Sequence, residues 1–126
     1  MTPEAFFIGY LTQALTPPPV NGEAQPGVNV SGCVPHPMPE EFVTVELTGS
    51  SRVDMIDRVV LSIECWSTSR DAACDLLAKV DAAMRGSAAK DEVSRCELET
   101  SYNDTDTETH RPRYHARYGI VYLGGN

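Results

Sequence analysis

Several classes of protein are excluded by what this 126-residue chain lacks. It has no run of about 18 apolar residues, so a membrane-spanning helix is not expected. Its first residues, 1–8, place no basic side chain ahead of the apolar ones, and we therefore expect no secretory signal. The four cysteines are far apart and form no C-x-x-C pair, which favours free, buried thiols over disulfides or a zinc site.

Basic residues are also scarce, at 10 against 18 acidic ones, which gives a net charge of −8. Proteins that bind nucleic acid over a broad surface need clustered Lys and Arg, so this class is disfavoured. The charges are unevenly spread. The segment 91–108 carries seven acids and a single base, Arg95, whereas Arg111, Arg113 and Arg117 follow with no acid among them. These two segments could pair within one subunit, pair across a subunit boundary, or remain solvated.

Motifs for common chemistries are missing as well. The chain has no G-x-G-x-x-G, no phosphate-binding loop and no G-x-S-x-G. The histidines, His36, His110 and His115, have no metal-ligand spacing, so we expect structural or exposed roles for them. The acids of segment 104–108 alternate like calcium ligands but lack the glycine and distal glutamate of an EF-hand. We therefore expect no catalytic residue, no cofactor, no metal and no enzymatic activity.

The most informative segment is 57–84, where a strand pattern gives way to a helix pattern. Apolar residues alternate with others along 59–66, which is typical of a strand with one buried face. Ser67, Thr68 and Ser69 then offer hydroxyls that can cap a helix. Apolar residues from Ala72 to Met84 follow one helical stripe that ends at Gly86. The segment thus predicts a sheet covered by a helix.

The remaining elements complete an α+β prediction for one domain, residues 1–126. We expect a helix at 3–15, polar flexible loops at about 16–27 and 103–110, and a turn at Gly49–Ser51. The predicted strands cover about 28–34, 42–47, 55–66, 92–102 and 113–123. The order is α-β-β-β-α-β-β, which implies a single, mainly antiparallel sheet covered by two helices.

The aromatic residues have two interpretations. Trp66, Tyr114, Tyr118 and Tyr122 could stack on nucleic-acid bases, but the absence of interleaved Lys favours core or subunit-interface positions. Combined with the charge pattern, this gives a candidate subunit or partner interface. Its members are Trp66, Asp104, Asp106, Glu108, Arg111, Arg113 and Arg117.

Four segments together resemble the tail-terminator, or tail-completion, proteins of long-tailed bacteriophages. They are the proline-rich approach to a strand at 34–45, the strand at 57–66, the helix at 67–84 and the strand Arg111-Pro-Arg-Tyr-His-Ala-Arg-Tyr118. The likeness covers about 100 residues, from Val28 to Leu123, and depends on the order and spacing of these pieces.

The resemblance implies a virion structural protein that is assembled in the host cytoplasm and located in the tail or neck. Such proteins form a six-fold ring on the head-proximal end of the tail tube, end its polymerisation and contribute to the head–tail junction. The implied partners are other copies of the chain, the tail tube protein and head–tail connector proteins. DNA would pass through without specific binding, and no membrane is involved.

Other functions give different expectations. A head–tail stopper or adaptor of the same virion would have similar size and composition. A ligand-binding α+β domain would have an apolar pocket lined by Tyr114, Tyr118 or Tyr122. A small hydrolase or isomerase would bring carboxylates with shifted pKa values together in a cleft. The candidates for that role are Glu46, Glu64, Glu97 and Glu99.

Overall fold

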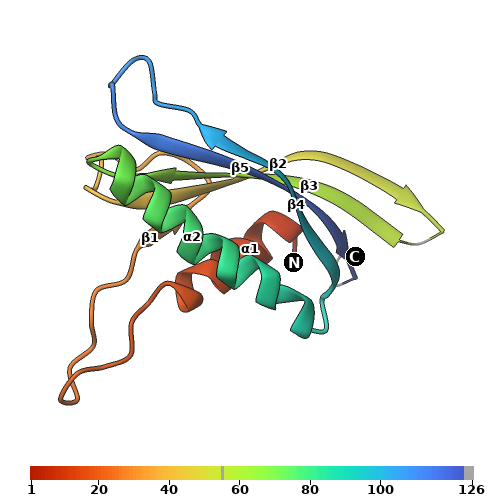
Figure 1. The fold of residues 1–126 in the computed structure, drawn as a ribbon. Coiled ribbons are helices and arrows are strands. Elements are labelled where there is room, and N and C mark those ends of the chain that lie inside the picture. The colour runs from red at the N-terminus through yellow and green to blue at the C-terminus, as the bar shows by residue number, and fades with distance from the viewer. Residues whose placement is uncertain (55, 124–126) are drawn as a thin grey trace.

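The computed structural model describes residues 1–54 and 56–123 and has an α+β fold (Figure 1). One five-stranded sheet has the order β1-β2-β3-β5-β4. The strands are β1 (Asn29–Ser31), β2 (Phe42–Val53), β3 (Ile56–Trp66), β4 (Val93–Asn103) and β5 (Arg113–Tyr122). The helices are α1 (Pro3–Ala14) and α2 (Arg70–Gly86), with a short 3-10 helix η1 (Ser87–Ala89) before β4. The predicted class and element order are confirmed.

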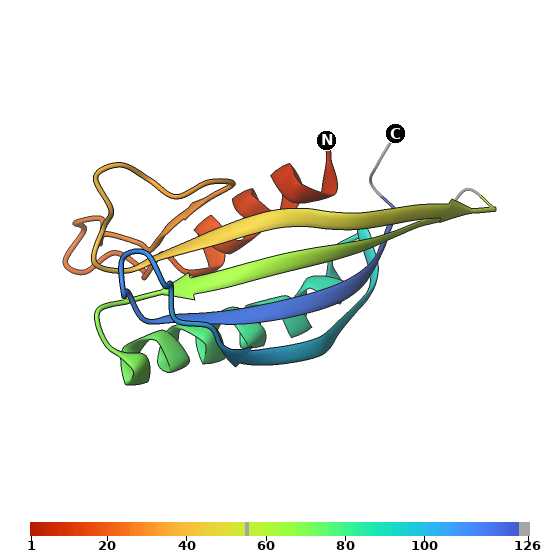
Figure 2. The same ribbon diagram turned by 90° about the horizontal axis from the view of Figure 1, so that it is seen from above.

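Both helices lie on the same face of the sheet (Figures 1 and 2). α1 packs against β1 and β2, and α2 packs against β3, β4 and β5. The side chains between the layers form one apolar core, in which the alternate residues of β3 and β5 face the helices. The central members of this core are Phe7, Leu11, Val45, Leu61, Ile63, Leu76, Val80, Met84, Tyr118 and Ile120. Within residues 1–54 and 56–123, no helix lies over the opposite face of the sheet (Figures 1 and 2).

The start of α2 shows how the sequence sets this geometry. Ser69 is the N-cap residue, and its hydroxyl accepts a hydrogen bond from the Ala72 N–H at 3.1 Å. Asp71 lies in the first turn, where a negative charge suits the positive end of the helix dipole. Only three residues, 67–69, separate the end of β3 from α2, so the helix must fold back onto the sheet that β3 belongs to.

One detail of the sheet refines the prediction, and another corrects it. β1 pairs with β2 in parallel, so the sheet is mixed, although every other pairing is antiparallel. The predicted turn at Gly49–Ser51 is wrong, because β2 continues through it to Val53. A register shift between Leu47 and Gly49 leaves Thr48 as the extra residue of a β-bulge, and Gly49 pairs with Val60. The chain turns later, next to Asp54, whose φ is 51°; Met55, where the next strand was expected to start, lies outside the described residues.

The segment 16–27, which was predicted to be a flexible loop, contains a tight turn. Val20 and Glu23 exchange both backbone hydrogen bonds at 2.9 Å around Asn21 and Gly22. Both central residues have positive φ, 52° and 81°, as the commonest two-residue hairpin turn requires. The flexibility expected of this loop stays a prediction. Among the described residues, no helix is both long and apolar enough to cross a membrane.

The prediction of free cysteines is confirmed, but the prediction of their burial holds only in part. Cys65 is buried in the core and Cys96 is half-buried, whereas Cys33 and Cys74 are exposed. Burial raises the pKa of the Cys65 thiol, and the nearby carboxylates of Glu41 and Glu64 raise it further. The Cys65 thiol is therefore a small apolar core group, whereas Cys33 and Cys74 are accessible to solvent.

Candidate functional site

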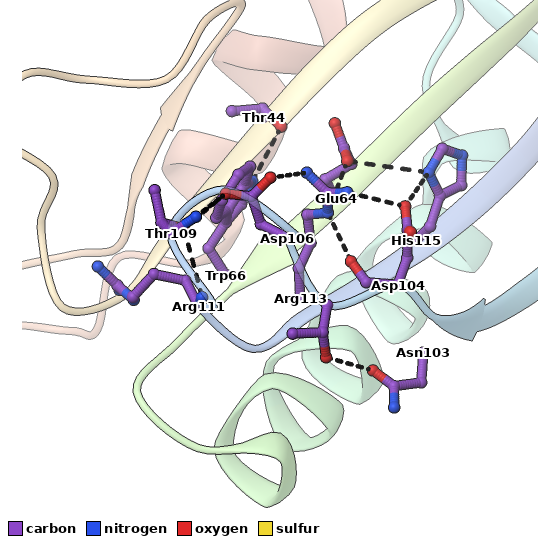
Figure 3. Close-up of polar contacts among 11 residues, drawn as sticks. Thr44, Glu64, Trp66, Asn103, Asp104, Asp106, Thr109, Arg111, Arg113 and His115 are labelled. Atoms are coloured by element: carbon purple, nitrogen blue, oxygen red, sulfur yellow. Dashed lines mark hydrogen bonds and ion pairs between the residues drawn. The ribbon is translucent and has the colours of Figure 1, made fainter.

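The richest group of polar side chains lies on the helix-free face of the sheet, where β3 ends and β5 begins (Figure 3). Glu64 and Trp66 of β3 stand next to His115 and Arg113 of β5, because the antiparallel register pairs Glu64 with His115 and Trp66 with Arg113. The segment between β4 and β5, residues 104–112, lies over these strands and adds Asp104 and Asp106. We call these six residues the Arg113 cluster.

Arg113 is the centre of this cluster. Its guanidinium lies 3.1 Å from a carboxylate oxygen of Glu64, 3.1 Å from one of Asp104 and 3.6 Å from one of Asp106. Its Nε also donates a hydrogen bond to the Asp104 backbone carbonyl at 2.7 Å. Because its side chain is only 17% exposed, these pairs are screened less than surface ion pairs. Arg113 therefore fixes the 104–106 segment to the sheet.

Trp66 is buried although it lies on the helix-free face. Phe42 of β2 stacks on it with 5.0 Å between ring centroids, and the Arg113 guanidinium lies 4.8 Å from its ring centroid. Its indole N–H donates to the Thr44 hydroxyl at 3.4 Å. An aromatic ring sandwiched in this way combines apolar burial with a cation–π contact. Trp66 thus provides the apolar surface on which the Arg113 guanidinium packs.

Arg111 holds a different part of the chain. It donates to the backbone carbonyls of Pro39 and Glu40 at 3.0 and 2.6 Å, and to that of Ser67 at 3.3 Å. The guanidinium also lies 5.9 Å from the Phe42 ring centroid. Carbonyl groups of the proline-rich connector between β1 and β2, which would otherwise need water, are satisfied by this one side chain. Arg111 therefore binds the proline-rich connector to the segment that leads into the first residue of β5.

Asp106 shapes the tip of the 104–112 segment. Its Oδ2 accepts hydrogen bonds from the backbone N–H of Thr109 at 3.0 Å and from the Thr109 hydroxyl. These bonds, the hydroxyl bond first, hold the pKa of Asp106 below its ordinary value, with a smaller contribution from the positive charge of Arg113. The loop predicted to be flexible thus has a defined local structure, and Figure 1 shows that it projects beyond the sheet. Its flexibility in solution stays a prediction.

His115 completes the Arg113 cluster. Its ring stacks on that of Tyr102 in β4, with centroids 5.1 Å apart and planes 14° apart. Its Nδ1 lies 3.8 Å from a carboxylate oxygen of Asp104 and 4.0 Å from one of Glu64. These separations exceed ordinary hydrogen-bond lengths, so His115 faces both acids without a direct bond to either.

The structure brings together five of the seven residues predicted for the interface. Those five are Trp66, Asp104, Asp106, Arg111 and Arg113. Glu108 is exposed in the loop, and Arg117 lies farther along β5, where its half-exposed side chain pairs with Glu99 at 2.9 Å. The acidic and basic segments could have paired within one subunit, paired between subunits, or remained solvated. Asp104 and Asp106 pair with Arg113 of the same chain. Whether any of the seven contacts a partner stays a prediction.

Sequence reasoning missed Glu64 and His115 as members of the cluster. Glu64 was considered only as a possible acid–base residue, and His115 only as a structural or exposed side chain. The signal that could have found them is alternation: residues 64 and 66 share one face of their strand, and residues 113 and 115 share one face of theirs. The register that places the two pairs opposite each other depends on the whole sheet.

The side chains named for the two alternative classes differ in burial and in partners. Tyr118 and Tyr122 are each 1% exposed and belong to the core, so they do not line an open pocket. Glu64, Glu97 and Glu99 each pair with a different arginine, Arg113, Arg95 and Arg117. Glu97 and Glu99 both line one surface pocket of about 430 Å³, together with Arg58 and Arg95.

We compared the chain with protein-family models and with curated proteins. No protein-family model matches the chain, and no curated protein matches it. The class that fold and site define is therefore an α+β domain with one helix-covered sheet face and one uncovered face that carries the Arg113 cluster.

Proposed function

We propose that this protein is a tail terminator of a long-tailed bacteriophage. In this role it forms a hexameric ring on the head-proximal end of the tail tube, stops polymerisation of the tube and provides part of the head–tail junction. Its partners are then further copies of itself, the tube protein and the connector proteins, and its place is the virion, after assembly in the host cytoplasm. It acts by binding, without catalysis or a cofactor.

The observation that carries the proposal is the uncovered side of the sheet. In the described part of the chain, helices cover one face only, and strands β2 and β3 extend beyond both helices (Figures 1 and 2). A ring closes through two different patches on each subunit, and a sheet with a bare face, a projecting hairpin and a projecting loop offers several. The order and spacing of the motifs that resemble tail terminators support the same assignment.

The free edge of the sheet supports an assembly role as well. β4 is one of the two edge strands, and two of its large side chains, Leu98 and Tyr102, are 44% and 49% exposed. Tyrosine and other large side chains are enriched where subunits meet, because they bury much area at little entropic cost. β4 also carries bulges and charged residues, which protect it from unspecific strand pairing. We therefore place the subunit contact at side chains of β4.

The Arg113 cluster refines the predicted interface. Arg113 is engaged by three carboxylates of its own chain, so its replacement would disturb the 104–112 segment whether or not a ring forms. Glu108 and Arg117 are the exposed members of the predicted set and are the ones able to reach a neighbour. The net charge of −8 suits a ring through which DNA passes, because phosphates are attracted to basic linings.

Native mass spectrometry and electron microscopy of the protein mixed with isolated tail tubes test the proposal. We expect a hexamer and extra density at one end of each tube. Growing tubes should also stop lengthening when the protein is added. Binding to connector complexes without binding to tubes would instead identify a head–tail stopper or adaptor. A protein that stays monomeric and leaves tube growth unchanged contradicts the proposal.

A further inference from the structure

Three side chains of the Arg113 cluster point metal-ligand atoms toward one another. They are Glu64 of β3, Asp104 of the 104–112 segment and His115 of β5, and their nearest ligand atoms all lie within 4.8 Å of one another (Figure 3). His115 Nδ1 lies 3.8 Å from Asp104 Oδ2 and 4.0 Å from Glu64 Oε2. Ligand atoms of a tetrahedral zinc ion with bonds of about 2.1 Å are about 3.4 Å apart. Small side-chain movements would therefore bring all three into coordination distance.

The three ligands are held in place by other residues. Stacking on Tyr102 fixes the plane of the His115 ring, so that Nδ1 faces the two acids. Arg113 binds Glu64 through Nε and Asp104 through Nη2, each at 3.1 Å. Outer groups that orient ligands in this way are a regular feature of metal sites. Arg113 contacts the same two oxygens that face His115, so a metal ion would share them with the guanidinium.

The charges of the cluster leave room for a cation. Glu64, Asp104 and Asp106 face one guanidinium, that of Arg113, so acids outnumber bases by three to one. Arg111 does not change this balance greatly, because its guanidinium donates to the carbonyls of Pro39 and Glu40. His115 is the remaining group that faces the acids, and a neutral imidazole is the form that binds a metal.

We propose that Glu64, Asp104 and His115 bind a divalent zinc ion, with water at its fourth position. One imidazole nitrogen and two carboxylate oxygens suit zinc, whereas magnesium and calcium prefer oxygen ligands alone. The ion joins the 104–112 segment to β3 and β5 and so reinforces the contacts that Arg113 makes. This site goes beyond the proposed function and does not depend on it, because it is complete within one chain.

Isothermal titration of the untagged protein with zinc chloride at slightly alkaline pH tests the site. All variants carry Cys33→Ser and Cys74→Ser, since exposed thiols bind zinc by themselves. We expect one ion per chain. His115→Gln and Glu64→Gln should each weaken binding at least about tenfold, the scale seen when groups around a metal are lost. His110→Gln, an exposed histidine five residues away, is the matched control and should leave the affinity unchanged.

A second readout does not depend on how the variants fold. In NMR spectra of the protein with both serine substitutions, zinc should shift the imidazole signals of His115 and leave those of His36 and His110 in place. Equal zinc affinity with and without His115 overturns the proposal. So does an unchanged His115 signal at millimolar zinc, which would mean that Arg113 already satisfies both acids and keeps the cation out.

Discussion

At the scale of single residues, the clearest case is the buried pair of Tyr118 and Asp81. The Tyr118 hydroxyl donates to Asp81 Oδ1 at 2.8 Å, and Asp81 is 8% exposed. Arg85, one helical turn later, also contacts this carboxylate. Burial raises the pKa of Tyr118, and the hydrogen bond to Asp81 and its negative charge raise it further. This pair connects β5 to α2 through the core.

Tyr118→Phe should lower the free energy of unfolding by about 2 kcal/mol, because a hydrogen bond to a buried charged group is lost. Urea unfolding followed by circular dichroism measures the change. The matched control is Tyr102→Phe, whose side chain is 49% exposed, and it should change stability by less than about 0.5 kcal/mol. Equal effects of the two substitutions would show that the Asp81 bond contributes nothing.

Asp106 offers a pH-dependent test at the same scale. Its pKa is lowered in the folded protein, so its contribution to stability is present above the ordinary aspartate value of 3.8. That contribution is lost as the pH falls through the lowered value. In NMR spectra, the amide signal of Thr109 should therefore titrate with a midpoint below 3.8 and stop responding to this transition in Asp106→Asn. A midpoint at or above that value contradicts the geometry of the turn.

At the scale of elements, three hydroxyl residues before α2 look alike in the sequence but have different roles in the structure. Ser67, Thr68 and Ser69 all carry a hydroxyl before the helix, and only the structure shows which one caps it. Ser69 accepts from the Ala72 N–H, whereas Ser67 is buried and its hydroxyl donates to Glu41 at 3.3 Å. Thr68 is exposed.

Ser69→Ala should cost about 1 kcal/mol of stability, the usual effect of removing an N-cap side chain. Thr68→Ala is the neighbouring control and should have little effect, since its side chain is exposed. Thermal unfolding of the two variants side by side gives the comparison. A larger loss for Thr68→Ala than for Ser69→Ala would place the cap one residue earlier.

α1 is fastened to the sheet by an element-level contact that periodicity cannot reveal. Glu4 reaches across to β2 and accepts a hydrogen bond from the Leu47 N–H at 2.9 Å, beside the bulge at Thr48. β1 pairs with β2 only as far as Thr44, so the Leu47 N–H takes its partner from outside the sheet. The prediction of a helix at 3–15 was correct. The contact of this helix with β2 could not be predicted from the periodicity of the sequence.

At the scale of the whole molecule, the proposed ring depends on surfaces that the fold leaves uncovered. Leu98→Lys should reduce the hexamer signal in native mass spectra at least about tenfold, because a charge enters the proposed apolar contact on β4. The fold should survive, since Leu98 is 44% exposed. Val20→Lys, at a position 54% exposed in the 16–27 loop, is the control and should leave the hexamer intact. An unchanged hexamer in Leu98→Lys would remove β4 from the interface.

What the sequence determined by itself was the set of elements. Helix and strand periods depend on neighbours within about ten residues, so α1, α2, β3 and β5 could be predicted closely. The predicted turn at Gly49–Ser51 was wrong for the same reason. Glycine and serine favour turns locally, but here all three residues pair with β3, just after a bulge at Thr48.

Only the tertiary structure decided the strand order, the parallel pairing of β1 and the Arg113 cluster. The charge pattern placed Asp104, Asp106 and Arg113 among the candidate interface residues. They pair within one chain because the 104–112 segment lies over β5. Glu64 and His115 joined them through the register of two strands that are distant in sequence. Such contacts depend on how the entire sheet buries its apolar face, and no short window of sequence contains that information.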